Sequence, residues 1–219
     1  MHIEYIGEET AAQARSRYLK EMMHIRRVTA AQLSSMTGVP QRTIERYTSG
    51  RTDIAATPGL NVALISYVLS MNAYMLGGAD DIKPGAVFMS DGKQVVVKQY
   101  DFVLYSRQGA QNAFLWSMTK NGLSEKELAE KAGVPKRVIL DMTGGRTDIR
   151  RMRARTVFGI CRALTFHPYF LYGLRDMEEY GPYLKKQRMA QEQRQARKEI
   201  LEEAERIVRE RAAQKDQGE

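Results

Sequence analysis

The chain has 219 residues, of which 43% are apolar and 27% charged, and its formal net charge is +8. This length allows two small domains, and the composition is that of a folded protein rather than a disordered one. No apolar run approaches the roughly 18 residues of a membrane helix. The first residues lack a basic region followed by an apolar core, so we expect no secretory signal. We accordingly expect a cytoplasmic location.

The sequence shows no pattern typical of a catalytic site. The single cysteine, Cys161, lies in an apolar helical stretch and is expected in the core. Neither it nor the three histidines show metal-ligand spacing. We find no glycine loop suited to phosphate and no nucleophile–base pair, so no catalytic site, cofactor or metal is expected.

In chain order, residues 1–13 form an N-terminal segment in which Ile3-Glu4-Tyr5-Ile6 could form a strand. Residues 14–78 then read as a module of five helical stretches. The second has the capping-box pattern from Thr29 to Gln32, Gly38 suits a tight turn, and Pro40 suits the start of the third. The predicted helices are Ala14 to about Arg26, Thr29 to about Met36, Pro40 to Thr48, Leu60 to Met71, and a last turn at residues 74–76.

Residues 79–108 are expected to link this module to the next through a β-hairpin. Two β-prone runs within residues 86–100 flank Asp91-Gly92, which is a strong turn signal. A hairpin alone is marginal, so the strand at residues 3–6 would complete a small sheet that acts as a spacer.

The first module returns at residues 109–175. Gly38-Val39-Pro40-Gln41-Arg42-Thr43-Ile44 reappears as Gly133-Val134-Pro135-Lys136-Arg137-Val138-Ile139, an offset of 95 that also relates residues 50–54 to 145–149. The sequence therefore predicts two copies of one helical unit. The second copy is expected to have helices at Gln111 to about Asn121, Ser124 to about Ala132, Pro135 to Thr143 and Arg151 to Phe166, with a last turn at 169–171.

Residues 182–215 are rich in Ala, Glu, Gln, Lys and Arg and predict a charged C-terminal helix with a narrow apolar stripe. Three interpretations stay open: a coiled coil that forms a homodimer, a helix docked on the body, and a solvated tail. Positive charge is concentrated on the modules, with a net +5 over residues 14–78 and +7 over 109–175. This distribution indicates a surface that binds a polyanion, and we favour that interpretation over a generically basic surface without a specific partner.

A short helix, a glycine turn and a third helix form a helix-turn-helix, and here the pattern resembles the DNA-binding domain of the Cro and phage-repressor type (XRE-like). The resemblance covers residues 14–78 and 109–175. The residues that carry it are Leu33, Gly38, Val39, Ile44, Gly50 and Leu69, with Leu128, Gly133, Val134, Ile139, Gly145 and Leu164 in the second copy. It implies a mainly α protein with two tandem five-helix units.

The resemblance also implies that the start of each third helix enters the major groove. The base-reading residues would then be Gln41, Arg42, Thr43, Arg46, Lys136, Arg137, Val138 and Asp141. Phosphate contacts are expected from Thr29, Arg51, Ser124, Arg146, Arg150, Arg151, Arg153 and Arg155.

Two of these assignments have alternatives. Asp141 could accept a hydrogen bond from cytosine or hold Arg137 in place four residues away, and we favour the second role. The arginines at 150, 151, 153 and 155 could lie on a solvated face with intrahelical pairs. Few acids lie near them in the sequence, so phosphate contact is favoured. Asp53 and Asp148 are expected to cap a turn.

We therefore expect a sequence-specific reader of double-stranded DNA, nucleoid-associated in the cytoplasm, such as a bacterial or phage transcriptional regulator. An accessory factor for replication, partition or transfer of a mobile element is the alternative within DNA binding. An antitoxin-like module that holds a protein partner is the alternative from another class. DNA binding by the first copy would distinguish this module from a DNA-binding protein, because the flank of the first copy is less basic and that copy is the candidate for holding a protein partner.

Overall fold

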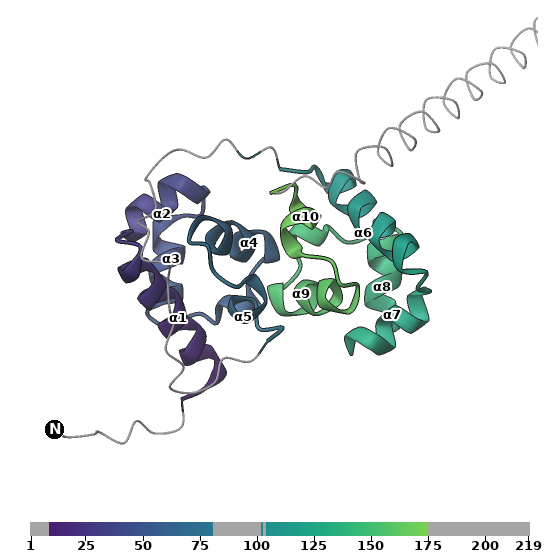
Figure 1. Cartoon of the computed structure of the whole chain (residues 1–219), viewed down its shortest axis with the longest axis horizontal. Coiled ribbons are helices and arrows are strands. Elements are labelled where there is room, and N and C mark those ends of the chain that lie inside the picture. Colours follow the sequence, from purple (N-terminus) through teal and green to yellow (C-terminus); the bar gives the residue numbers. More distant parts are fainter. Residues whose placement is uncertain (1–8, 81–101, 103, 175–219) are drawn as a thin grey trace, which may run out of the picture. The chain divides into compact units, whose positions relative to one another are not determined.

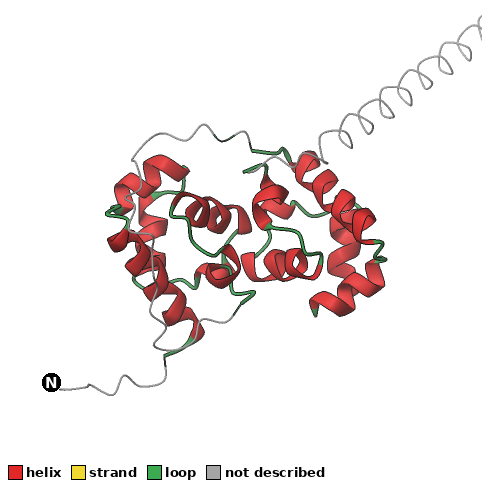
Figure 2. Cartoon of the chain, viewed as in Figure 1, coloured by secondary structure: helices red, strands yellow, loops and turns green. Residues whose placement is uncertain are grey.

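The structure is a computed structural model, and it describes residues 9–80, 102 and 104–174. The chain divides into two compact units, Met1–Asp176 and Met177–Glu219, and the described residues all belong to the first. The expected strand at residues 3–6, the hairpin at 86–100 and the helix at 182–215 lie outside them. The described part is mainly α-helical and contains no strand (Figure 2), so the mainly α expectation is confirmed.

The elements repeat in the same order along the chain (Figure 1). Residues 11–76 form α1 (Ala11–Ile25), α2 (Ala30–Thr37), α3 (Gln41–Thr48), the 3₁₀ turn η1 (Ile54–Ala56), α4 (Gly59–Val68) and α5 (Ala73–Leu76). Residues 107–172 form α6 (Arg107–Asn121), α7 (Glu125–Ala132), α8 (Lys136–Thr143), η2 (Ile149–Arg151), α9 (Ala154–Ala163) and α10 (Pro168–Tyr172). We call these two sets repeat 1 and repeat 2.

The first and fourth helices of each repeat have bounds that differ from the expected ones. Helix α1 begins three residues early, because Thr10 and Gln13 form a capping box, and α6 begins four residues early at the Ser106 cap. The predicted helix from Arg151 to Phe166 is too long, since Arg151 belongs to η2 and α9 ends at Ala163. In repeat 1 the fourth helix begins at Gly59, one residue before the expected Leu60, and ends at Val68, three residues before the expected Met71.

The residues that cap both ends of α2 and of α7 are those predicted from the sequence. Thr29 and Gln32 form a capping box on α2, as Ser124 and Glu127 do on α7. Gly38 ends α2 in the left-handed region with φ 71°, a conformation that disfavours a side chain, and the equivalent glycine of repeat 2 has φ 64°. The turn into α3 and α8 is therefore set locally.

Each repeat has its own core. Leu33, Ile44 and Leu69 are fully buried in repeat 1, as are their counterparts 95 residues later. Cys161 is buried too, as expected, and so is Trp116. Burial raises the pKa of the Cys161 thiol, which keeps it protonated and unreactive.

The two repeats pack together through their fourth and fifth helices with reciprocal contacts (Figure 1). Helix α4 lies against its counterpart α9, α5 against α9, and α10 against α4. The Gly59 amide donates to the Met152 carbonyl and the Ala154 amide donates to Thr57, both at 2.8 Å. Residues 152 and 154 are the counterparts of 57 and 59, so each bond is the mirror of the other under exchange of the repeats.

A second pair of bonds obeys the same exchange. The Tyr74 hydroxyl donates to the Phe166 carbonyl at 3.3 Å, and the Tyr169 hydroxyl donates to the Met71 carbonyl at 3.2 Å. Contacts in which residue i meets j and j meets i define an interface with two-fold symmetry. Repeats 1 and 2 are therefore related by an approximate two-fold axis.

The packing across this axis is not symmetric. The Phe158 ring of repeat 2 lies so close to Gly77 of repeat 1 that a Cβ there would be 2.1 Å from the ring. A Cβ on Gly59 would likewise lie 2.3 Å from the hydroxyl oxygen of Tyr172. The counterparts of Phe158 and Tyr172 in repeat 1 are Ala63 and Gly77. Large residues of one repeat thus fill space left by small residues of the other, which favours unlike pairs.

Candidate functional site

Helices α3 and α8 present one face to the core and the opposite face outward. Ile44 and Tyr47 anchor α3, and Ile139 and Met142 anchor α8; all four are buried. The intervening positions therefore point away from the core. The outward positions of α3 are Gln41, Arg42, Glu45 and Arg46, and those of α8 are Lys136, Arg137, Leu140 and Asp141.

The first helix of each repeat fixes the end of this element. The Ser16 hydroxyl donates to the carbonyl of Thr48 at 2.8 Å, and the Gln111 amide donates to the carbonyl of Thr143 at the same distance. Residues 16 and 111 are counterparts, and so are 48 and 143. Different side chains thus make the same bond, which satisfies a carbonyl at the helix end and limits movement of α3 and α8.

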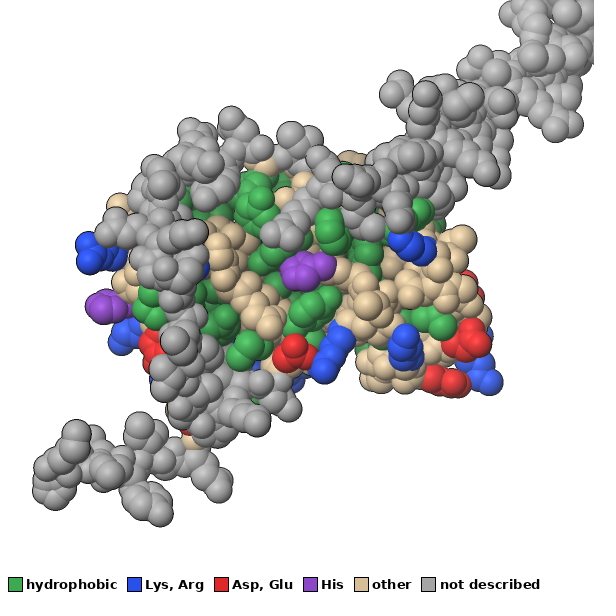
Figure 3. Space-filling model, in the orientation of Figure 1, with side chains coloured by type: hydrophobic (Ala, Val, Ile, Leu, Met, Phe, Trp, Pro, Cys, Tyr) green, Lys and Arg blue, Asp and Glu red, His purple; other side chains and the backbone are tan. Residues whose placement is uncertain are grey.

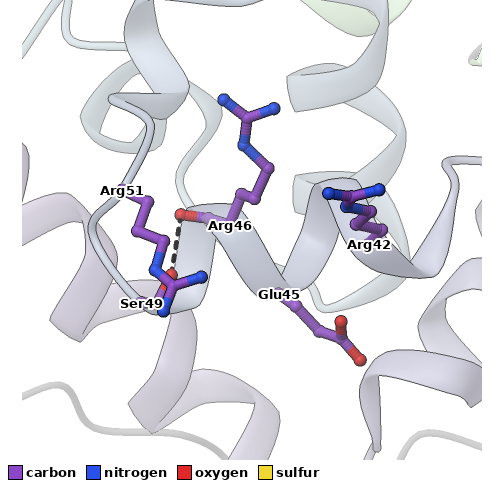
Figure 4. Close-up of a pocket in the computed structure, with 5 residues that line it drawn as sticks. All are labelled: Arg42, Glu45, Arg46, Ser49 and Arg51. Atoms are coloured by element: carbon purple, nitrogen blue, oxygen red, sulfur yellow. Dashed lines mark hydrogen bonds between the residues drawn. The ribbon is translucent and has the colours of Figure 1, made fainter.

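The outward face of α3 borders a hollow of about 480 Å³ lined by Arg42, Glu45, Arg46, Ser49 and Arg51 (Figure 4). Within residues 9–80 and the other described positions, none of these three arginines makes an ion pair. Glu45 instead accepts a hydrogen bond from the Gln41 amide at 2.8 Å, and it points away from Arg46 (Figure 4). The structure therefore brings three of the expected residues of repeat 1 together as a cationic surface, with Thr43 half-buried beside it.

The corresponding surface of repeat 2 is partly neutralised. Asp141 pairs with Arg146 at 2.7 Å and more loosely with Arg137, at 3.8 Å. Of the two roles considered for Asp141, holding arginine is the one seen, but the tighter partner is Arg146. The pair of Asp141 with Arg146 could not be predicted from helical spacing, because Arg146 follows the helix end and lies outside the i, i+4 pattern.

The remaining residues of α8, and one arginine of α6 near its end, differ in exposure and contacts. Lys136 and Arg137 are exposed, the Arg137 side chain by 90%, and Val138 is half-buried. Leu140, which the sequence analysis did not single out, is 37% exposed on the same outward face. Arg107 at the start of α6 donates to the carbonyl of Gly145 and so supports the loop after α8.

The N-termini of α2 and α7 differ as anion sites. In both, the capping box uses the amides of the first and fourth residues, Thr29 and Gln32 or Ser124 and Glu127. Helix α2 has no acid in its first turn, whereas α7 has Glu125 and Glu127. Hydrogen bonds from the Ser124 amide and hydroxyl lower the pKa of Glu127, so it stays charged. The expected phosphate contact is better supported at Thr29 than at Ser124.

The arginine cluster of repeat 2 has more acidic partners than its sequence neighbourhood indicated. Arg150 donates to both oxygens of Asp148, at 3.0 and 2.8 Å, and Arg151 lies 3.9 Å from the same carboxylate. Arg155 reaches across to Asp53 of repeat 1 at 3.6 Å. The expectation of few nearby acids was wrong, because Asp148 lies two residues from Arg150 in the sequence and folding brings Asp53 to Arg155.

Arg153 is the member of the cluster for which the described residues supply no ion pair. It is exposed, and its backbone forms an isolated antiparallel bridge with Pro58 at the two-fold axis. Within the cluster, Arg153 is therefore best placed to meet a phosphate, while Arg150 and Arg155 have structural roles.

A buried ion pair stabilises repeat 1 and was not foreseen. Arg15, whose side chain is 4% exposed, donates to both oxygens of Asp53, at 3.0 and 2.9 Å. Asp53 also accepts from the Ala55 amide, so its expected capping role is confirmed, as is that of Asp148. Burial opposes ionisation of Asp53, but the bonds from Arg15 and Ala55 outweigh it and lower the pKa of the carboxyl.

On the face drawn in Figure 3, a histidine and an adjoining acidic and basic side chain lie near the middle among uncharged atoms, and further Lys and Arg side chains lie toward both edges. No described helix is long and apolar enough to cross a membrane, and no group of three potential metal ligands occurs in the same part of the chain. No family model, curated protein or solved structure matches the chain. Its function must be inferred from its own residues.

Proposed function

We propose that this protein is a sequence-specific double-stranded DNA-binding protein with two helix-turn-helix heads, formed by α2–α3 and α7–α8. The observation that carries the proposal is the pair of outward arginine-bearing helices, α3 and α8, in two repeats whose fourth and fifth helices make reciprocal contacts. A helix with exposed arginine and amide groups fits the major groove, whose bases offer matching acceptors and donors. Repressor-like regulation of transcription in a bacterium or phage is the role we infer.

The two-fold relation supports a particular arrangement of the DNA. Two heads related by such an axis match two half-sites in inverted orientation, with centres about 34 Å apart if both heads meet one side of the duplex. One chain then supplies both heads of a dimeric repressor. Because the heads differ in sequence, the inverted repeat is imperfect.

The assignment of single residues follows from their surroundings. Arg42 and Arg137 occupy equivalent exposed positions in the first turn of their helices and are the leading base contacts. Arg51 and Arg153, for which the described residues supply no ion pair, are the leading phosphate contacts, supported by the amides at the start of α2, whereas Arg146 is paired with Asp141.

Selection of bound duplexes from a random pool tests the proposal, with the full chain and its Arg42→Ala and Arg137→Ala variants. We expect a two-part motif that loses one part with each substitution, at about 1–3 kcal/mol for each lost contact. Lys20→Ala is the matched control, because Lys20 is an exposed residue of α1 and its removal lowers the charge equally. Binding that depends on salt alone and enriches no motif would refute sequence-specific reading.

A further inference from the structure

The two reading surfaces agree at their ends and differ in the middle. The positions that line the hollow of repeat 1 map by the offset of 95 onto a matching set in repeat 2. Arginine occupies both 42 and 137, and both 51 and 146. The three positions between them change from Glu45, Arg46 and Ser49 to Leu140, Asp141 and Gly144.

In repeat 1 the middle of the surface offers a cation. Arg46 is exposed, and the described residues provide no carboxylate within ion-pair distance of it. Its neighbour Glu45 bonds to Gln41 and is turned away (Figure 4). The guanidinium is left to donate two parallel hydrogen bonds, and guanine, with its O6 and N7 acceptors, is the base that accepts them in the major groove.

In repeat 2 the same region offers an apolar group. Asp141, the counterpart of Arg46, is committed to Arg146 at 2.7 Å. Leu140 is exposed on the adjoining position, one turn from Arg137. The fold does not require an apolar residue there, because its counterpart is Glu45. In the major groove, the thymine methyl group is the feature that an apolar side chain contacts.

We infer that the two heads read chemically different half-sites: Arg46 selects guanine in one, and Leu140, the counterpart of Glu45, selects thymine at an adjoining position of the other. Arg42 and Arg137 make the same contact in both halves. This inference rests on the proposed DNA-binding function. Every chain carries one head of each kind because both repeats belong to one polypeptide, and the unlike packing of Phe158 against Gly77 favours their pairing with each other. The protein therefore binds its site in one direction only.

Exchange of the middle residues between the heads tests this inference. Duplex selection is performed with the full-length wild type, with Glu45→Leu/Arg46→Asp and with Leu140→Glu/Asp141→Arg. The first variant should enrich a nearly symmetric site with thymine at the matching position of both halves. The second should enrich guanine in both. Thermal unfolding of each variant verifies that the exchange leaves the fold intact.

Two single substitutions keep the test decisive if an exchanged head folds poorly. Arg46→Ala should lower affinity for the guanine-containing site about tenfold, and should have no effect on the preference for thymine in the other half. Leu140→Ala should do the reverse. If the wild type enriches no motif, the proposed function fails. If it enriches a motif in which these substitutions and exchanges change neither half, DNA reading stands and our assignment of the middle positions is overturned.

Discussion

The packing of Phe158 against Gly77 predicts a strong coupling between two residues that are 81 positions apart in the chain. A Cβ at residue 77 would lie 2.1 Å from one ring carbon and 2.6 Å from the next, and Phe158 is fully buried. The Gly77 backbone has φ −79°, which alanine adopts easily, so Gly77→Ala acts mainly through this contact, beside a close approach of 3.0 Å to the Ala73 carbonyl oxygen. We expect it to lower the free energy of unfolding by about 2 kcal/mol.

Phe158→Ala should cost about 4 kcal/mol, because it empties a buried site. It also makes room for a methyl group at residue 77, so the double variant should be only about 4 kcal/mol less stable than the wild type. Urea unfolding of the four proteins measures the coupling as about 2 kcal/mol. Additivity within about 0.5 kcal/mol would refute the unlike packing of the two repeats.

Three further predictions concern stability. Asp53→Ala should lower the free energy of unfolding by about 3 kcal/mol, because it leaves the buried guanidinium of Arg15 without a partner. Asp148→Ala should lower it by only about 1 kcal/mol, because the partners of Asp148 are more exposed. Equal losses of stability in urea unfolding would argue against the buried pair. Since the folded state lowers the pKa of Asp53, its contribution is present above about pH 4 and lost as the pH falls further; Asp53→Asn should weaken that acid dependence, as measured by thermal melts. Gly38→Ala should destabilise the protein by about 1 kcal/mol, because Gly38 has a φ of 71° that disfavours a side chain. Gly159→Ala should be neutral or stabilising, because Gly159 lies in a helix and has open space around it. The reverse order of stabilities would contradict the turn geometry.

Local structure could be predicted from the sequence because its signals are local. The Thr29 and Ser124 capping boxes and the glycine turns at 38 and 133 all lie within a few residues of the helices that they end. The offset of 95 then transferred each assignment to the other repeat. The irregular segment before α9 carries no such signal, and there the predicted start of the helix was wrong.

The ion pairs and the interface between repeats could not be predicted in the same way. Arg15 and Asp53 are 38 residues apart, and Arg155 meets Asp53 across the two repeats. A helical period shows which face of a helix is buried, but not what lies against it. The sequence therefore identified the outward residues of α3 and α8 and missed the pairing of Asp141 with Arg146.

A change of half-site orientation tests most directly whether the protein carries two reading heads related by a two-fold axis. The duplex enriched by selection is compared with one in which a single half-site is inverted in place, leaving composition and spacing unchanged. Titration at fixed salt should show at least a hundredfold loss of affinity for the direct repeat, since only one head can then bind with its own contacts. Equal affinity for both duplexes would contradict a fixed two-fold pair.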